Sequence, residues 1–434
     1  MSNNGEYEYI NVIPSNQPAD GLIKFDSMPI VNFNIGSQER LLMGSSLRLT
    51  GEFIVKNAAG GAVLDTDKVC IDPTIGVLSC IDQLNISSKK SNQTIEEIRN
   101  YNKFLGSYYK AFQDKDELVT CESLTALKSQ TLNQSNRLLC DKPAVYKPFS
   151  VGLPSGFLLS QDDPREGKYG ISLSSQYGIG GLYLQLMLAP SSNVLFNFTG
   201  GALDPGEAGV TYEIRNLRLK ATLQRPTPEI QANIMKNNRL VFNSISSHNT
   251  TISSSYGTVN FNLGLSNVLS AFVSFVKGAN VNSYKHGLAT NGIQDDAGNN
   301  LDITNVQWLK NNMIFPNQFE IQDNNNFDFY NPILIRQFFN GIGSIHKNDR
   351  DNVYDSVNLK QNYVNKAYGD FTGNALNLAI CLDGYSDSGV DYSTEQLGLI
   401  VESNLTDNTS NQVYLFVCAR QELVLSPQGV TLIQ

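Results

Sequence analysis

Apolar and polar residues alternate for longer than a typical strand in residues 210–228, VTYEIRNLRLKATLQRPTP. Tyr212 and Ile214 share one face, and after Asn216 the phase shifts so that four apolar residues share one face: Leu217, Leu219, Ala221 and Leu223. A period of two with one slip predicts a long strand that carries a bulge. Because Pro226 cannot donate a hydrogen bond to a sheet, we expect the strand to end there and to close a first β domain.

The length of the chain predicts two domains, because one hydrophobic core stops growing at roughly 250–300 residues and this chain has 434. Hydrophobic residues make up 41% of the chain and charged residues only 17%, which is typical of a large β-rich protein with uncharged loops. The 21 Phe and 19 Tyr residues argue against disorder. We therefore predict an N-terminal arm at residues 1–24, a first domain at 25–225 and a second domain at 226–434.

The charge of the chain argues against direct, sequence-specific binding of nucleic acid. The formal net charge is −9 and no run of Lys or Arg exceeds two. Binding to the phosphates of a nucleic acid needs a basic stripe or arm. The first residues, MSNNGEYEYI, do not resemble a signal peptide, and the apolar run at 268–276 is far shorter than the roughly 20 residues that span a bilayer. We expect a soluble product of cytosolic synthesis. Six cysteines are then predicted to be free thiols: Cys70, Cys80, Cys121, Cys140, Cys381 and Cys418.

Further segments of the first half have the pattern of half-buried strands. They are 28–35, 47–56, 76–87, 146–153, 169–173 and 182–188. Two helices are also predicted. Thr94 and Glu97 match a capping box, and apolar residues follow at helical spacing as far as Tyr108. A second helix is expected at 123–132.

The same order of features recurs in the second half. Strands are expected at 259–263, 271–276, 303–308, 376–382, 397–401 and 413–425, with a helix-like segment at 332–339. Matching features lie roughly 200–240 residues apart, which is the spacing of whole domains and not of short repeats. Seven or more strands per half, long loops and a helix within each domain fit a jelly roll better than an up-and-down barrel or a propeller. Periodicity alone does not separate a jelly roll from another sandwich.

Five segments carry a resemblance to a known family. They are GVLSCIDQLNIS (76–87), TIEEIRNYNKF (94–104), LSAFVSFV (269–276), ITNVQWLKNNMIFP (303–316) and NPILIRQFF (331–339). Their layout resembles the double jelly-roll major capsid proteins of icosahedral DNA viruses, which include those of virophages and polinton-like viruses and adenovirus hexon. In that family a strand leads through a polar break into a helix on the flank of each roll. The resemblance covers about residues 25–434. The lack of large loop insertions implies that the loops build only a short tower on top of the two rolls.

The resemblance implies an all-β fold of two tandem eight-stranded jelly rolls with short flanking helices. It also implies a structural role in the virion: three copies would form a pseudo-hexameric capsomer, and capsomers would tile an icosahedral shell. The partners would be other copies of the chain, neighbouring capsomers, penton and minor capsid proteins, and a membrane beneath the shell is compatible with it. The arm 1–24 and the tail Ser426–Gln434 are expected to run along the base and tie neighbours together.

The search for catalytic residues finds none. His248, His286 and His346 are the only histidines, and none belongs to a metal or nucleophile motif. The glycines of GIGG at 178–181 are better explained by a tight turn than by a dinucleotide loop, because a strand follows them instead of a helix. Trp308 is expected to be a packing anchor, although stacking on a carbohydrate is an alternative role.

A cluster of oxygen donors at Asp295–Asp302 could bind calcium, but ordinary turn chemistry explains it better, since the spacing of an EF-hand is absent. We therefore predict no catalytic, cofactor-binding or metal-binding residues, no cofactor and no enzymatic activity. Two other function classes stay open. A carbohydrate-binding or adhesin-type sandwich would suit the Asn- and Tyr-rich loops, and a glycoside-acting enzyme ranks last because no carboxylate pair forms a recognisable motif.

Overall fold

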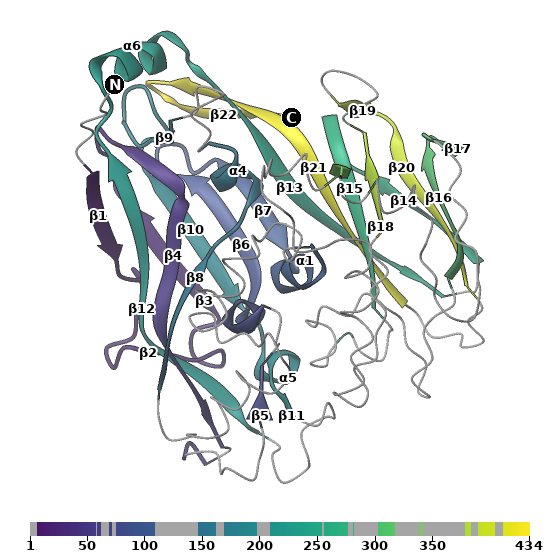
Figure 1. Cartoon of the computed structure of the whole chain (residues 1–434), viewed down its shortest axis with the longest axis horizontal. Helices are drawn as coiled ribbons and strands as arrows, with labels where there is room; N and C mark the ends of the chain where they lie inside the picture. The colour runs from purple at the N-terminus through teal and green to yellow at the C-terminus, as the bar shows by residue number, and fades with distance from the viewer. Residues whose placement is uncertain are drawn as a thin grey trace.

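The computed structural model describes residues 7–57, 59–61, 69–71, 75–108, 146–161, 169–197, 209–253, 256–276, 281, 303–316, 337, 340–341, 378–382, 389–403 and 411–434. This part of the chain consists mainly of β-strands in antiparallel sheets (Figure 1). No helix within it is long and apolar enough to cross a membrane.

The first half is a sandwich of two sheets. The main path of one sheet has the order β1 (Tyr7–Val12), β12 (Thr211–Gln224), β4 (Leu41–Lys56) and β8 (Lys147–Gly152). The other has the order β3 (Ile30–Ile35), β10 (Leu182–Leu188), β6 (Ile81–Ser88) and β7 (Thr94–Arg99). Numbered one to eight along the chain, these principal strands lie in the order 1-8-3-6 in the first of these sheets and 2-7-4-5 in the second. This is the wiring of a jelly roll.

The second half repeats this wiring strand for strand. One sheet has the order β13 (Arg239–Ile252), β21 (Asn411–Ser426), β15 (Leu265–Val276) and β18 (Leu378–Cys381). The other has the order β14 (Tyr256–Asn262), β20 (Gln396–Ser403), β16 (Ile303–Lys310) and β17 (Met313–Ile314). The prediction of an all-β chain built from two tandem jelly rolls is therefore confirmed.

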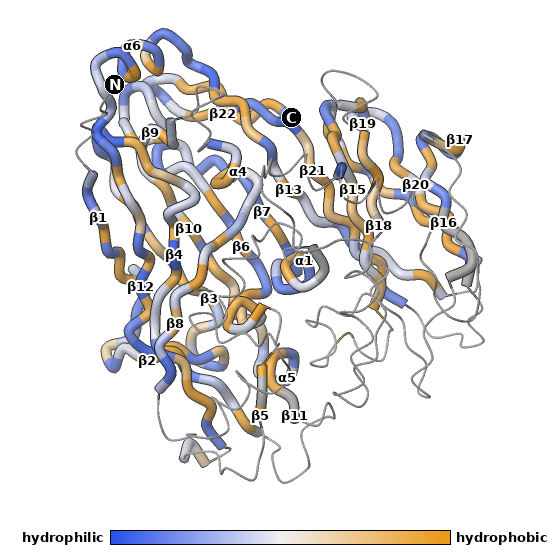
Figure 2. The backbone as a smooth tube through the Cα atoms, in the orientation of Figure 1, coloured by the Kyte–Doolittle hydropathy of each residue, from blue (hydrophilic) through white to orange (hydrophobic). Residues whose placement is uncertain are grey.

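Shorter elements complete the described part. The additional strands are β2 (Leu22–Ile23), β5 (Val69–Cys70), β9 (Ile171–Ser172), β11 (Phe196–Asn197), β19 (Val390–Tyr392) and β22 (Gly429–Ile433). The helices are η1 (Gly76–Cys80), α1 (Tyr101–Tyr108), α4 (Gly156–Leu159), α5 (Ser191–Val194) and α6 (Pro228–Lys236). Figure 2 shows how hydrophobic and hydrophilic residues are mixed along the strands.

The long strand that ends before Pro226 is β12, and its phase shift is a bulge, as predicted. The register between β12 and β4 shifts between Arg215 and Arg218, and Asn216 lies there with a φ of 54°. Asn adopts this left-handed conformation more readily than most residues because its short amide can hydrogen-bond locally. Its Nδ2 donates to Glu52 on β4 over 2.8 Å. Beyond the bulge, the apolar side chains return to the core face.

The helix predicted to begin at Thr94 is wrong, because residues 94–99 form strand β7 along β6. The apparent helical spacing of Ile95 and Ile98 arises because β7 is buried on both faces, and Glu96 between them is buried as well. The helix begins only at Tyr101, after Asn100 has taken a φ of 53°. The strand predicted at 76–87 likewise begins late, since residues 76–80 form the short helix η1.

The N-terminal and C-terminal segments are parts of the sheets. The expectation that residues 1–24 lie outside the first sandwich is wrong for Tyr7–Val12, which pair with β12 as strand β1. Ile10 and Val12 pack against the core, so the scattered apolar residues of this segment anchor it to its own chain. The expected tail after Ser426 turns back as β22 and pairs with β21.

Several predicted features lie outside the described residues. These are the helix at 123–132, most of the helix at 332–339, Cys121, Cys140 and the Asp295–Asp302 segment. Within the described residues, Cys80, Cys381 and Cys418 are free thiols, as predicted. The glycines at 178–181 lie in a turn, in which the main-chain N–H groups of Gly178 and Gly180 both donate to the Ser174 carbonyl.

Candidate functional site

The surface that joins the two sandwiches is apolar at its centre. The ring of Phe104 on α1 lies 5.3 Å from that of Phe416 on β21, and the ring of Phe157 on α4 meets Phe242 on β13 edge-on at 5.0 Å. These pairs belong to one continuous core cluster that extends from the first sandwich onto the second. The first half therefore covers the outer face of the β13–β21–β15 sheet.

The strand β21 shows how the sequence permits this arrangement. Val413, Leu415 and Val417 point into the core of the second sandwich. Phe416 and Cys418 alternate with them and pack in the cluster shared with the first. A strand that is apolar on both faces must be covered on both faces, because burial of apolar surface is favourable by about 25 cal/mol per Å². Burial of Cys418 and Cys80 in this cluster also removes two thiols from solvent.

One buried carboxylate connects three segments at this joint. Glu96 on β7 is only 2% exposed. Its Oε1 accepts from the main-chain N–H of Ile245 on β13 over 2.6 Å and from that of Gly156 over 3.1 Å. Its Oε2 accepts from the N–H of Phe157 over 3.1 Å. Burial raises the pKa of Glu96 to about 7, against the opposing effect of these donors. Sequence reasoning missed this residue and singled out the neighbouring Glu97.

The close approach at Glu96 also depends on a glycine. A Cβ at Gly156 would lie 2.5 Å from the carbonyl oxygen of Asn243 and 3.0 Å from Oε1 of Glu96. Beside it, the main-chain N–H of Arg99 donates to Oγ of Ser247 over 2.8 Å. Hydrogen bonds therefore fix β7 and α4 against β13 and complement the apolar contacts.

The C-terminal hairpin of β21 and β22 adds a second polar contact between the halves. Nζ of Lys90, in the turn between β6 and β7, donates to the Ser426 carbonyl over 2.5 Å. Oγ of Ser91 donates to the Val430 carbonyl and accepts from the N–H of Val430, each over 3.2 Å. The C-terminal segment thus ties the two sandwiches of its own chain together.

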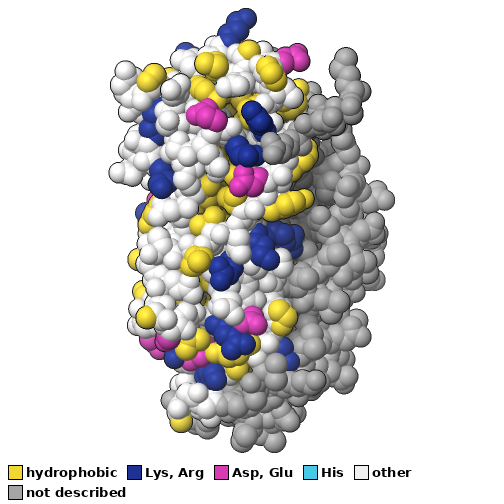
Figure 3. All heavy atoms as spheres, turned by 90° about the vertical axis from the view of Figure 1, so that its left-hand side faces the viewer, with side chains coloured by type: hydrophobic (Ala, Val, Ile, Leu, Met, Phe, Trp, Pro, Cys, Tyr) yellow, Lys and Arg dark blue, Asp and Glu magenta, His cyan; other side chains and the backbone are white. Residues whose placement is uncertain are grey.

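The outer face of the first sandwich is different, because it is exposed, basic and rich in Tyr. Since Leu219 of β12 lies in the core, Lys220 points outward, opposite Arg48 of β4. On the neighbouring strand β1, Tyr7 and Tyr9 are 52% and 82% exposed. Figure 3 shows several Lys and Arg side chains, with hydrophobic side chains and some Asp and Glu between them, on the side of the molecule that carries β1. Chemically, this surface suits an acidic partner that also offers apolar side chains.

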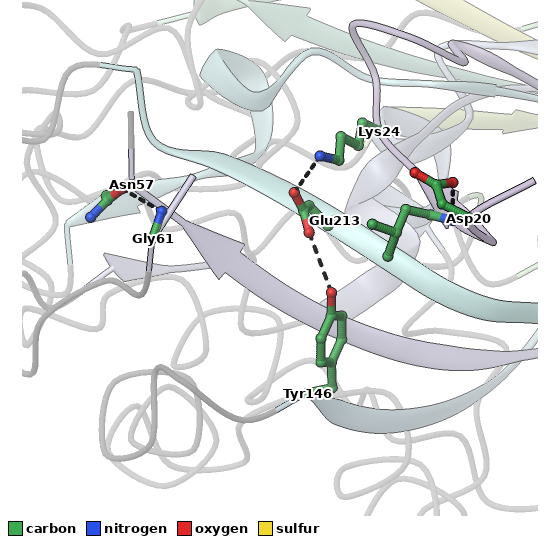
Figure 4. Close-up of polar contacts among 7 residues, drawn as sticks. Asp20, Lys24, Asn57, Gly61, Tyr146 and Glu213 are labelled. Atoms are coloured by element: carbon green, nitrogen blue, oxygen red, sulfur yellow. Dashed lines mark hydrogen bonds and ion pairs between the residues drawn. The ribbon is translucent and has the colours of Figure 1, made fainter. Parts of the chain in front are cut away.

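A polar cluster holds the segment after β1 against the same sheet. In Figure 4, the Glu213 carboxylate on β12 lies between Lys24 and Tyr146. Lys24 Nζ is 2.7 Å from Oε1, and the Tyr146 hydroxyl donates to Oε2 over 3.3 Å. The hydrogen bond to Glu213 raises the pKa of Lys24 above its usual value. The Arg215 guanidinium stacks 3.8 Å from the centre of the Tyr146 ring. These contacts are structural and place no catalytic pair together.

The other residues that the sequence analysis singled out have structural roles where they lie within the described part of the chain. Trp308 is 1% exposed and packs in the core of the second sandwich, which confirms it as a packing anchor. His248 is half-buried on β13, with its Nε2 3.3 Å from Oγ of Ser246. Among the described residues, no group of three or more His, Cys, Asp or Glu could hold a metal ion.

Comparisons with solved structures identify the fold. The chain matches the PBCV-1 virus capsid protein in a quasi-atomic model (TM-score 0.56, 11% identity, 100% of this chain and 98% of that one). It matches the Faustovirus major capsid protein (TM-score 0.56, 12% identity, 97% and 91%) and the Sputnik virophage structure (TM-score 0.52, 11% identity, 99% and 88%). No protein-family model matches the sequence, and neither does any curated protein.

These likenesses extend over nearly the whole length of both partners in each comparison. At identities of 11–12%, they establish the fold. The chain has the double jelly-roll fold found in viral major capsid proteins, in agreement with the resemblance of its sequence to that family. The repeated strand order of the two sandwiches is the feature of this chain that agrees with this fold.

Proposed function

We propose that this protein is a non-enzymatic major capsid protein of a DNA virus. The observation that carries the proposal is the joint: two jelly rolls of identical wiring are fixed side by side by a shared core. A rigid pair of this kind is a suitable building block for a closed ring, because repeating the same contact between chains gives a symmetric assembly. The full-length likeness to capsid proteins supports this role.

In the proposed assembly, three copies form a pseudo-hexameric capsomer, and capsomers tile an icosahedral shell. The chain divides into a first roll that ends at residue 225 and a second roll that begins at 226, with α6 after the division. Neighbouring capsomers, penton and minor capsid proteins would be the partners, and the protein would be synthesised in the host cytoplasm before it enters the virion.

Light scattering of the purified chain tests the proposal. A homotrimer, and flat or closed lattices of that trimer under electron microscopy, are the expected results. A chain that stays monomeric at high concentration and forms no lattice would contradict the capsid role. Binding of the monomer to a glycan array would instead favour a carbohydrate-binding sandwich.

A further inference from the structure

The two sandwiches depend on the joint to different degrees. Among the described residues, the first half contributes 46 buried hydrophobic residues to one continuous core cluster that reaches the joint. The second half has a separate core of 21 residues. More than a third of the buried hydrophobic residues described in the second half lie outside that core. Twelve of them belong to the cluster of the first half: Phe242, Ile245, Leu269, Phe272, Val276, Ala379, Tyr414, Phe416, Cys418, Leu423, Leu425 and Val430.

The strand β15 shows this division at the level of single residues. Ala271 and Val273 point into the core of the second sandwich, whereas Phe272 between them packs in the cluster of the first half. The counterpart of β15 in the first sandwich is β4, because each is the third principal strand of its half. There Arg48 and Glu52 lie on the outward face and are partly exposed. Water can cover a polar face of this kind, but an apolar face needs a protein partner.

We propose that the second sandwich keeps its fold only while it is docked on the first, whereas the first keeps its fold without the second. Undocking would bring water to Phe272, Phe416 and the other residues of the second half in the shared cluster. Burial of apolar surface is the dominant favourable contribution to folding, and the net stability of a domain is small by comparison. A sandwich that loses the burial of a third of its apolar residues therefore unfolds. This dependence holds whether or not copies of the chain assemble.

The first sandwich loses much less when the joint opens. Phe104 and Phe157 meet the second half from the helices α1 and α4, while the rest of the cluster stays within the first half. The carboxylate of Glu96 would also return to water, which solvates a charged group better than a buried joint does. The dependence between the two sandwiches is therefore one-way.

The order of the chain agrees with this dependence. Domains fold as units during synthesis, the N-terminal one first, so the first sandwich forms before the second is complete. β13 is the first strand of the second sandwich to be made, and the N–H of its Ile245 donates to Glu96 of the first. Only residues 225–238, which include α6, separate β12 from β13. This short connection holds β13 close to the surface that it meets.

Urea denaturation of the full-length chain tests the inference with a separate signal for each sandwich. Trp308 is the only tryptophan of the chain and is 1% exposed in the core of the second sandwich, so its fluorescence reports that half. Pulsed hydrogen exchange of the β10 peptide, read by mass spectrometry, reports the first half, because β10 lies between β3 and β6. All variants are compared at one protein concentration.

The variant Phe416→Asp places a charge in the joint but outside the core of the second sandwich. Because a buried, unpaired charge is unfavourable, docking should weaken. Trp308 should then leave its buried environment at a urea concentration lower by about 1 M or more than in the natural chain, while β10 keeps its protection through this first transition. The matched control is Lys220→Asp on β12, the counterpart of β21. It changes an exposed residue and should leave both transitions where they are.

Two results with Phe416→Asp would overturn the inference. If its Trp308 transition matches that of the natural chain, the second sandwich does not need the first. If Trp308 and β10 change together, the two sandwiches form one cooperative unit and the first does not stand alone. Phe33→Ala, in the core of the first sandwich, gives the reciprocal test. In that variant the two signals should change together, and loss of β10 protection while Trp308 stays buried would contradict the inference as well.

Discussion

At the scale of single residues, Glu96 links two parts of the chain that are far apart in sequence. It accepts hydrogen bonds from the main-chain N–H groups of Gly156, Phe157 and Ile245. All three donors lie in the buried joint, and a buried donor that loses its acceptor costs about 1–3 kcal/mol. The carboxylate therefore stabilises the joint even though its own burial is unfavourable.

Replacing Glu96 by Ala should lower the free energy of unfolding by about 3 kcal/mol or more, since three buried N–H groups lose their acceptor. Glu96→Gln should cost less, because its side-chain oxygen can still accept from Gly156 and Ile245. Urea denaturation of purified protein measures both values. The control is Glu97→Ala, which removes a half-exposed ion pair with Arg99 and should cost less than about 1 kcal/mol. Equal losses at the two positions would contradict this role of Glu96.

The pH dependence of stability provides a second test of Glu96. Burial raises its pKa from an ordinary value of 4.5 to about 7, so the folded chain binds a proton that the unfolded chain releases. This contribution to stability is complete below pH 4.5 and is lost as the pH rises through 7. The free energy of unfolding of the natural chain, taken relative to that of Glu96→Gln, should therefore fall as the pH rises from 5 to 8. The expected fall is up to about 3 kcal/mol, at about 1.4 kcal/mol per pKa unit.

Comparing the natural chain with Glu96→Gln also cancels the effect of His248, which both proteins contain. The pKa of His248 is lowered by burial and by Arg99. That group works in the opposite direction, because its folded state releases a proton that the unfolded state still binds, so its contribution to stability grows as the pH rises toward 6.5 and is complete above it. Thermal unfolding in a series of buffers would measure the difference. A difference that does not change with pH would show that Glu96 does not titrate in this range.

At the scale of elements, the strands that the sequence predicted best are those with one polar face. β10 and β12 alternate clearly, because one side lies in the core and the other carries residues such as Gln185 and Lys220. β7 was mistaken for a helix because the joint buries both of its faces, and β1 was missed because only Ile10 and Val12 reach the core. The pairing across the joint involves two segments that are distant in the sequence, so no local sequence pattern predicts it.

The bulge in β12 makes a separate prediction about that strand. Asn216 has a φ of 54°, where a β-branched side chain is strained. Asn216→Val should therefore lower the free energy of unfolding by about 1–3 kcal/mol, whereas Asn216→Gly should cost less, because Gly adopts this conformation freely. Urea denaturation distinguishes them. Thr211→Val on the same strand is the matched control and should have little effect, and a similar loss there would argue against strain at the bulge.

At the scale of the whole molecule, the N-terminal segment belongs to the first sandwich and contributes to its surface. β1 covers the edge of β12 along its last six residues and pairs Tyr7 with Gln224 and Val12 with Leu219. The same strand leaves the side chains of Tyr7 and Tyr9 52% and 82% exposed. The segment therefore protects an edge of the sheet, and a deletion can test this role.

Removal of residues 1–12 should cause aggregation of the chain, and not merely stop assembly, because the uncovered edge of β12 presents unpaired N–H and C=O groups to other strands. Removal of residues 1–6 alone leaves β1 intact and should give a soluble chain that still forms trimers. The double variant Tyr7→Ser with Tyr9→Ser keeps the backbone pairing with β12 and removes only the two exposed rings, so it should stay soluble and is the matched control for the loss of the strand. Sizing by light scattering at increasing concentration measures all three. A chain without residues 1–12 that stays soluble at high concentration would show that β1 does not protect the edge of β12.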